Sequence, residues 1–334
     1  MQVFFLILIL NLAMFRYHQR IAKIINVYDY PCSKRKIHKT KTPLIGGALL
    51  LINLIFINIL YFFFNDFYFT DLNKIFGGLD KYFVFLFSSL IIFLIGYIDD
   101  KKNLNANLKF FLFIIITTLS IYLDHNLLLQ TIVVKSWNIN VNLLNFSFFF
   151  SVLCFLLFIN AANMYDGINL QSGPYFFGVY SYFLYKFGVN IFFLMILFFL
   201  IIFVLLNAKG KIFFGNSGIY LISFITAYIM IKQYNNLEVI SIEEIFLIMC
   251  IPGYDMLRLF LSRCYQIRSP FSSDRNHIHH IILKTRSVYF TQAFLFILNL
   301  VPIFIGSFIG YNYAVIFSLI VYIFVFYFFW RLSI

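Results

Sequence analysis

The chain has 334 residues, of which 62% are hydrophobic, 22% aromatic and only 11% charged. This composition excludes a soluble globular fold, a secreted domain, a disordered chain and an outer-membrane barrel, whose strands alternate polar and apolar residues. A helical bilayer crossing needs roughly 20 mostly apolar residues. The sequence therefore predicts an all-α polytopic integral membrane protein, and because no repeat or linker interrupts it, a single domain over residues 1–334.

Eleven apolar runs predict about eleven transmembrane helices. Residues 124–141 contain too short an apolar stretch for a crossing and are expected to form a loop or hairpin, and residues 187–190 are expected to form a turn. The runs cover residues 1–15, 44–64, 82–98, 108–123, 142–159, 174–188, 190–206, 218–231, 245–261, 289–308 and 312–330.

The net charge of +12 is distributed unevenly over the loops. With the N-terminus outside, one side holds 20 of the 25 Lys and Arg residues and a net charge of +14, against −2 on the other side. The positive-inside rule makes the basic side cytoplasmic and places the C-terminus there. The basic residues thus indicate topology, and no nucleic-acid partner is predicted. The four cysteines form no CxxC pair, so neither a disulfide framework nor a zinc site is indicated.

Four polar clusters lie at the predicted cytoplasmic helix ends, where we expect one shared site. The first is the adjacent pair Asp99 and Asp100, followed by Lys109. Paired carboxylates at a water interface can hold Mg²⁺ together with substrate phosphates, or can position a nucleophile. The alternative is a solvated loop of the kind that commonly joins membrane helices.

The second cluster is residues 160–169, NAANMYDGIN. Asn160, Asn163 and Asp166 are spaced by three residues and would share one face if the turn is helical. Carboxamides can read a pyrimidine edge, and Asn and Asp oxygens suit a hard cation. Ordinary helix capping is the alternative.

The third cluster is the glycine-bracketed turn at residues 209–218, which leads into the next apolar run. Backbone N–H groups at such a helix N-terminus favour an anion such as phosphate. A simple cap by Asn216 or Ser217 would explain the same pattern.

The fourth cluster, residues 268–280, contains Arg275, His277, His279 and His280. It lacks a fourth zinc ligand, whereas imidazole and guanidinium groups together suit the oxygens of phosphates and sugars. The alternative is a basic face against anionic lipid head groups.

These clusters, in this order, resemble the polyprenyl-phosphate N-acetylhexosamine-1-phosphate transferase superfamily (glycosyltransferase family 4) over essentially the whole chain. Residues 43–47 (PLIGG) are similar to its PxxGG loop, Asp99 and Asp100 to its aspartate pair, and residues 160–169 to NAxNMxDGIN. Residues 269–280 (SPFSSDRNHIHH) resemble SPFSPDRxHIHH of the branch that uses UDP-N-acetylglucosamine.

Two positions depart from the family pattern. Asn103 stands where an aspartate commonly completes DDxxD, and Asn216 stands where the family usually has the aspartate of GDxGS. The resemblance implies Mg²⁺, with Mn²⁺ as an alternative, and Asn163 and Asn216 as ligands beside the aspartate pair. An amide at position 216 keeps an oxygen ligand but removes one negative charge, so weaker metal binding or a metal-site-degenerate homologue would follow.

The resemblance also implies roles for the other matching residues. Asp99 would accept a residual proton or act as a nucleophile, and Asp100 would orient the metal or the lipid phosphate. Lys109 would pair with a phosphate, Asp166 would organise its loop, and Asn169 would read uracil. With Asn160, the residues expected to bind the UDP-sugar are Arg275, His277, His279 and His280.

The implied reaction transfers N-acetylglucosamine-1-phosphate from UDP-GlcNAc to undecaprenyl phosphate. It yields undecaprenyl-diphosphate-GlcNAc and UMP and initiates a cell-surface polysaccharide such as O-antigen. The expected location is the bacterial inner membrane, as a multi-pass protein, and a homodimer is compatible with the sequence. The same reaction with another UDP-N-acetylhexosamine remains open, and so does a transporter, although transporters place ionisable groups near the midplane of the bilayer.

Overall fold

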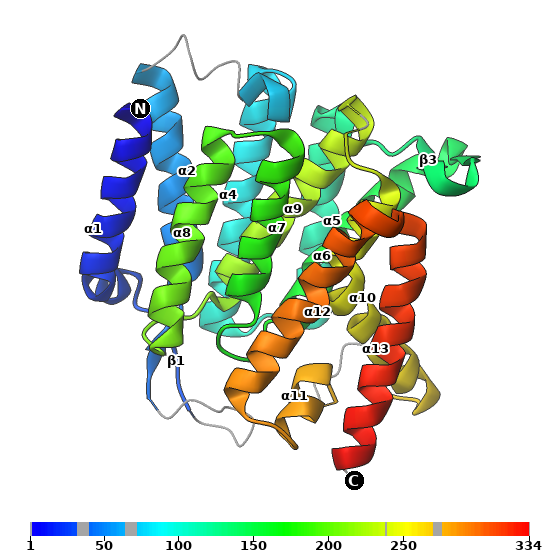
Figure 1. Ribbon diagram of the computed structural model, residues 1–334. Helices are drawn as coiled ribbons and strands as arrows, with labels where there is room; N and C mark the ends of the chain where they lie inside the picture. Colours follow the sequence, from blue (N-terminus) through cyan, green and yellow to red (C-terminus); the bar gives the residue numbers. More distant parts are fainter. Residues whose placement is uncertain (1, 32–39, 64–71, 238, 270–275, 334) are drawn as a thin grey trace.

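The computed structural model describes residues 2–31, 40–63, 72–237, 239–269 and 276–333. In these ranges eleven helices of 16 to 24 residues form the bundle shown in Figure 1, and each corresponds to one predicted apolar run. Their bounds are Gln2–Ile25 (α1), Gly46–Phe63 (α2), Leu79–Lys102 (α4), Ala106–Leu123 (α5), Ser147–Tyr165 (α6), Ser172–Phe187 (α7), Ile191–Ala208 (α8), Gly215–Leu237 (α9), Ile242–Tyr265 (α10), Val288–Ile309 (α12) and Tyr311–Ser333 (α13).

Eight of these described helices are long and apolar enough to cross a membrane, as expected of a multi-pass membrane protein. Helix α7, with 16 residues, is shorter than the others. Helix α9 carries polar side chains, among them Ser223 and Thr226, but its neighbours bury both completely. The all-α polytopic class is thus confirmed, whereas the count of eleven crossings and the orientation stay predictions.

Residues 124–142 form a hairpin and add no long helix. Strand β3 (Thr131–Val134) pairs antiparallel with β4 (Ile139–Asn142), and Ile132 lies opposite Val141. The predicted hairpin is therefore confirmed, but the helix expected from residue 142 begins only at Ser147, because β4 extends to residue 142. A second small sheet joins β1 (Tyr28–Asp29) to β2 (Thr42–Pro43).

The turn expected at residues 187–190 separates α7 from α8. Gly188 adopts a φ of 84°, a conformation that glycine adopts readily. The side chain of Asn190 caps α8 by accepting a hydrogen bond of 2.8 Å from the backbone N–H of Phe192.

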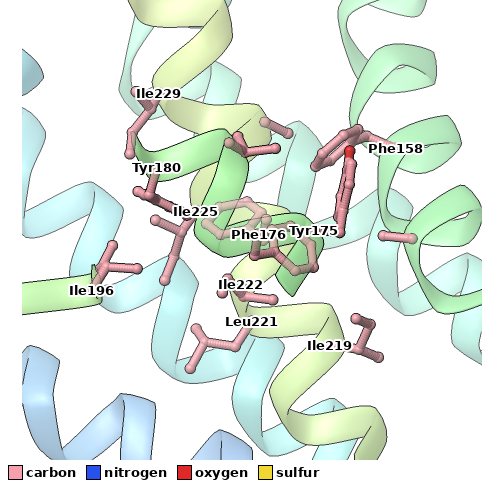
Figure 2. Packing of buried hydrophobic residues seen from close by; sticks show 14 of the residues in the cluster. Phe158, Tyr175, Phe176, Tyr180, Ile196, Ile219, Leu221, Ile222, Ile225 and Ile229 are labelled. Atoms are coloured by element: carbon pink, nitrogen blue, oxygen red, sulfur yellow. The ribbon is translucent and has the colours of Figure 1, made fainter. Parts of the chain in front are cut away.

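Helix α9 lies at the centre of the bundle, packed against α2, α4 and α6. Figure 2 shows its residues Ile222 and Ile225 in the same buried cluster as Phe176 and Tyr180 of α7. Tyr180 is also joined to Thr226 of α9 by a hydrogen bond of 3.2 Å between their hydroxyl groups. Because lipid is as apolar as these side chains, close packing and hydrogen bonds hold such helices together.

The bundle has two distinct ends, seen in Figure 1. The hairpin end carries β3, and the opposite end, called the site end below, carries the short helix α11 (Ile278–Leu283) and β1. The end of α4 and the start of α9 also lie at the site end. The polar clusters of the sequence are therefore gathered at one end of the molecule.

Candidate active site

Residues 43–47 lie directly against the turn that precedes α9. Leu44 forms a parallel bridge with Phe213, whose N–H donates to the carbonyl of Pro43 at 3.0 Å. The N–H of Gly46 donates back to the carbonyl of Phe213 at 3.0 Å. Two motifs more than 160 residues apart in the printed sequence thus form one backbone unit.

Glycines allow three chain segments to approach closely at this point. A Cβ atom at Gly47 would lie 2.5 Å from the backbone nitrogen of Gly218, and one at Gly96 would lie 2.6 Å from that of Ser217. Both separations are too short for a real Cβ atom. Glycine is therefore required here so that α2 and α4 can contact the start of α9, as small residues do in other membrane helix pairs.

Asp100 occupies the N-terminus of α9. Its Oδ1 accepts from the N–H of Asn216 at 2.7 Å, and its Oδ2 accepts from the N–H of Ser217 at 3.0 Å. Unpaired N–H groups at a helix N-terminus favour an anion. The sequence predicted an anion at this turn, and in the structure the Asp100 carboxylate takes that place.

Asp99 points into the protein, and its side chain is only 1% exposed. Its Oδ2 accepts from Lys109 Nζ at 3.1 Å and from the Tyr220 hydroxyl at 2.9 Å, and its Oδ1 accepts from the N–H of Leu104 at 2.8 Å. Asn103 ends α4 in the left-handed conformation, with a φ of 49°. The neighbouring aspartates therefore differ: Asp99 joins α4, α5 and α9, and Asp100 caps α9.

Asn160 and Asn163 lie in the last two turns of α6, which ends at Tyr165. Asn160 donates to the carbonyl of Leu156 at 2.7 Å. Asp166 is the residue after the helix, so the predicted helical spacing holds for the two asparagines and ends there. The hydroxyl of Ser172 donates to Asp166, and burial raises the pKa of the Asp166 carboxyl to about 6.

The loop after Asp166 is held by residues that the sequence analysis did not select. Asn207 of α8 accepts from the N–H of Leu170 at 2.7 Å, and Gln292 of α12 donates to the carbonyl of Asn169 at 2.5 Å. Both are amides in predominantly apolar helices, a signal that could have identified them. The position of Asn169 is thus set by α8 and α12.

The histidines lie on and beside α11. His279 is buried, and the distance from its Nδ1 to Gln171 Nε2 is 3.3 Å. Its ring lies against Gly167, so closely that a Cβ atom at position 167 would overlap it. Burial, together with the nearby imidazoles of His280 and His277, holds the pKa of His279 well below 6.5. His279 is therefore a neutral imidazole at neutral pH, and its ring lies 4.3 Å from that of His280 between centroids.

His277 is held by Asp255, which the sequence analysis missed. Asp255 Oδ2 lies 3.1 Å from His277 Nδ1, and Asp255 Oδ1 accepts from the N–H of Ile278 at 3.1 Å. Arg258 and Tyr322 also donate to Oδ1, at 2.7 and 3.1 Å. A charged pair three residues apart inside the apolar helix α10 was the available signal. Arg275, predicted to act beside these histidines, lies outside the described residues.

The predicted residues therefore form two groups at the site end. Asp99, Asp100, Lys109 and Asn216 are joined by direct contacts around the start of α9. The loop after α6 and the histidine segment form the second group, which meets at Gly167, Gln171 and His279. No three His, Cys, Asp or Glu side chains in the described part of the chain are arranged to hold a metal ion. Any cation held here would need amide or substrate oxygens.

The central part of the chain is similar to a known protein family. Residues 82–234 match the sequence profile of glycosyl transferase family 4. The resemblance inferred from the motifs is thereby confirmed. The matched region contains the first three polar clusters and ends before the histidine segment.

Curated relatives extend the similarity beyond that region. The chain is 24% identical over 284 residues to the undecaprenyl-phosphate alpha-N-acetylglucosaminyl 1-phosphate transferase of Escherichia coli O157:H7, an alignment that covers 80% of this chain and 71% of the relative. It is 27% identical over 294 residues to the protein of that name from Haemophilus influenzae, covering 83% and 77%. The relative from Yersinia pestis is 24% identical over 280 residues, covering 80% and 72%.

Proposed function

We propose that the protein transfers N-acetylglucosamine-1-phosphate from UDP-GlcNAc to undecaprenyl phosphate, giving undecaprenyl-diphosphate-GlcNAc and UMP. The observation that carries the proposal is the gathering of the aspartate cluster and the histidine segment at one end of a membrane bundle. The names of the relatives support the two substrates. The same gathering disfavours a transporter, whose ionisable groups would lie near the midplane of the bilayer.

In this reaction an oxygen of the lipid phosphate attacks the β-phosphorus of UDP-GlcNAc. The new O–P bond forms as the bond between the β-phosphorus and the UMP oxygen breaks. A phosphate monoester has a second pKa of about 6 and is largely dianionic at neutral pH, so no strong base is required. Positioning and electrostatics are expected to provide most of the rate enhancement.

The contacts of Asp99 support this direct route. To act as a nucleophile, its carboxylate, which is only 1% exposed and accepts hydrogen bonds at both oxygens, would first have to become accessible to the β-phosphorus. Lys109 has a side chain that is 25% exposed and carries two further N–H donors, so it can contact a substrate phosphate while it remains paired with Asp99. Asp99 then acts as the group that holds Lys109 in position.

Mg²⁺ is the proposed cofactor, with Mn²⁺ as the alternative, and Asp100, Asn163 and Asn216 are the proposed ligands. The donor set is suitable for Mg²⁺, which binds oxygen atoms of one or two carboxylates together with substrate phosphates. Each Asp100 oxygen accepts one backbone N–H and keeps a second lone pair. When bound, the cation would neutralise charge that develops on the diphosphate. The amide at position 216 makes this site less negative than a carboxylate would.

The loop after α6 and the histidine segment are the proposed UDP-sugar site. Asn160 and Asn169 offer amide donors and acceptors, the latter for uracil. His277, His279 and His280 are proposed to contact the diphosphate and the N-acetyl sugar. In the described structure, the buried Nε2 of His279 has no hydrogen-bond partner and lies against Gly167, so a ligand would reach it only after this loop moves.

We further propose that the site end faces the cytosol of a bacterial inner membrane, because it carries the excess of Lys and Arg. There the enzyme would initiate a cell-surface polysaccharide such as O-antigen. Another UDP-N-acetylhexosamine is the alternative substrate, since a few contacts near the histidines would decide between sugars.

Transfer of labelled GlcNAc-1-phosphate to undecaprenyl phosphate by the purified protein tests the proposal. We expect Asp100→Asn to lower kcat by about 10²-fold, as loss of one preorganised charged group does elsewhere. Asn216→Asp should lower the Mg²⁺ concentration that gives half-maximal rate. The matched control is Asp80→Asn, whose side chain is 73% exposed at the opposite end of α4. A wild type inert with every UDP-N-acetylhexosamine, or an Asp100→Asn variant of full activity, would contradict the proposal.

A further inference from the structure

A second polar site lies at the hairpin end, remote from the candidate active site. A cavity of about 330 Å³ opens between the β3–β4 hairpin, the end of α7 and the starts of α10 and α13. Its lining carries both signs of charge, from Lys135, Lys186, Glu243 and Glu244, with Ser136 and Tyr311 beside them. Cavities with a few converging polar groups are the usual form of small-ligand sites.

Glu244 is already fully paired within the protein. Its Oε1 contacts Lys186 Nζ at 2.7 Å and the Tyr182 hydroxyl, and its Oε2 accepts from the N–H of Ser241 at 2.8 Å. This residue thus closes the capping box at the start of α10. The Glu244 carboxylate is therefore satisfied by donors within the protein, and no ligand is needed to pair it.

Glu243 is different because one of its oxygens has no protein donor. The residue is only 6% exposed, and its Oε1 accepts from the Ser136 hydroxyl at 2.9 Å. In the described part of the chain, its buried Oε2 has no hydrogen-bond partner. A buried carboxylate oxygen without a donor is costly, so the Glu243 side chain, which lines the cavity, would be stabilised by turning to accept from a donor on a ligand there.

The cavity lies where membrane helices end. Helices α10 and α13, whose first turns border it, are both apolar enough to cross a membrane. Phe246 and Tyr313, near the starts of these helices and outside the cavity lining, are 46% and 63% exposed. Lys186 uses one contact for Glu244 and has further N–H donors for an anion. A ligand here would meet a carboxylate and an ammonium group at the ends of two helices that can cross a membrane.

We propose that this cavity binds the head group of a membrane lipid that joins a primary ammonium to a phosphate, as phosphatidylethanolamine does. The ammonium donates to the Glu243 carboxylate, and the phosphate lies beside Lys186. A quaternary ammonium carries no N–H and cannot make the first contact, so the site distinguishes ethanolamine from choline lipids. This inference is independent of the proposed transferase reaction.

Native mass spectrometry of the purified protein in detergent tests the site through a graded series of lipids. In phosphatidylethanolamine and its mono-, di- and trimethylated forms, the last being phosphatidylcholine, each methyl group replaces one N–H donor while the charge stays the same. We expect retention to fall along the series, with binding of the unmethylated lipid about tenfold tighter than that of phosphatidylcholine, as one charge-assisted hydrogen bond gives. Glu243→Gln should abolish this preference, and Asp80→Asn, at the same end but outside the cavity, should keep it.

Equal retention of all four lipids by the wild type would overturn the proposal. This comparison uses the wild type alone, so it does not depend on whether any variant folds. A preference that survives Glu243→Gln would overturn it as well. Water-soluble phosphoethanolamine is the third probe: weak binding compared with the lipid is expected, and equally tight binding would contradict a lipid ligand.

Discussion

Replacing Gly167 with alanine should separate the histidine segment from the loop after α6. A Cβ atom at position 167 would lie less than 3.0 Å from three atoms of the His279 ring, Nε2, Cε1 and Cδ2. Gly167 does not have a positive φ, so alanine fits the backbone and only the overlap matters. The nearest of these atoms, Nε2, would be only 2.0 Å away, and contacts are optimal at about 3.5–4.0 Å, so the ring or the loop must move by more than about 1 Å.

The displaced parts are both substrate-contacting groups in the proposed mechanism. A misplacement of about 1 Å can cost about 10²-fold in rate, so kcat/KM with UDP-GlcNAc should fall by about that factor. Thermal stability should also fall, by about 1–3 kcal/mol, because the added methyl group overpacks the buried His279 ring. The assay is the rate of labelled lipid formation, with the melting temperature measured on the same preparations.

Gly253→Ala is the matched control, since nothing lies within 4 Å of a Cβ atom there and alanine favours the helix. Activity of that variant should equal that of the wild type. If Gly167→Ala were equally active, His279 would not be held against this loop during the reaction. Combining Gly167→Ala with His279→Ala should cost no more than His279→Ala alone, as expected when both changes act on one contact.

Three further changes test other parts of the structure. Asp255→Asn removes the charge that holds His277 and should lower kcat by about 10-fold or more without loss of the folded state. The transfer rate measures the first effect and circular dichroism the second. An unchanged rate would show that Asp255 does not position His277 for the reaction. The pKa of Asp166 is raised from 3.8 to about 6, so the folded state binds the proton more tightly than the unfolded state does. The free energy of unfolding should therefore fall as the pH rises from about 4 to about 6. A plot of melting temperature against pH should show this fall for the wild type and not for Asp166→Asn. Lys232→Met leaves Asp124 buried without its ion-pair partner, whose Nζ lies 2.6 Å from Asp124 Oδ2. The free energy of unfolding should fall by about 3–5 kcal/mol, measured by denaturant titration. A fall of less than about 1 kcal/mol would refute this.

The helices could be predicted from the sequence because each apolar run is nearly as long as the helix that it forms. The turn at Gly188 was equally visible, since it interrupts two such runs. The hairpin boundary was less accurate: residue 142 belongs to β4, although its apolar neighbours suggested a helix. A short alternating segment next to a long apolar run gives no clear boundary in composition alone.

The chemistry of the site was only partly accessible. Asp99 and Asp100 are adjacent in sequence and were assigned together, but neighbouring residues on a helix point in different directions. One therefore meets Lys109 and Tyr220, and the other meets the backbone of α9. Asp255 was missed for a related reason: its partner His277 is 22 residues away, and only the fold brings the two together.

The central claim is that the site transfers a sugar phosphate and not a sugar, and the nucleotide product tests this most directly. Purified protein would be incubated with UDP-GlcNAc and undecaprenyl phosphate, and the nucleotide released would be separated by chromatography. The account predicts UMP in a one-to-one ratio with the diphosphate lipid, and none without the lipid phosphate. Release of UDP, or of UMP without a lipid product, would contradict it.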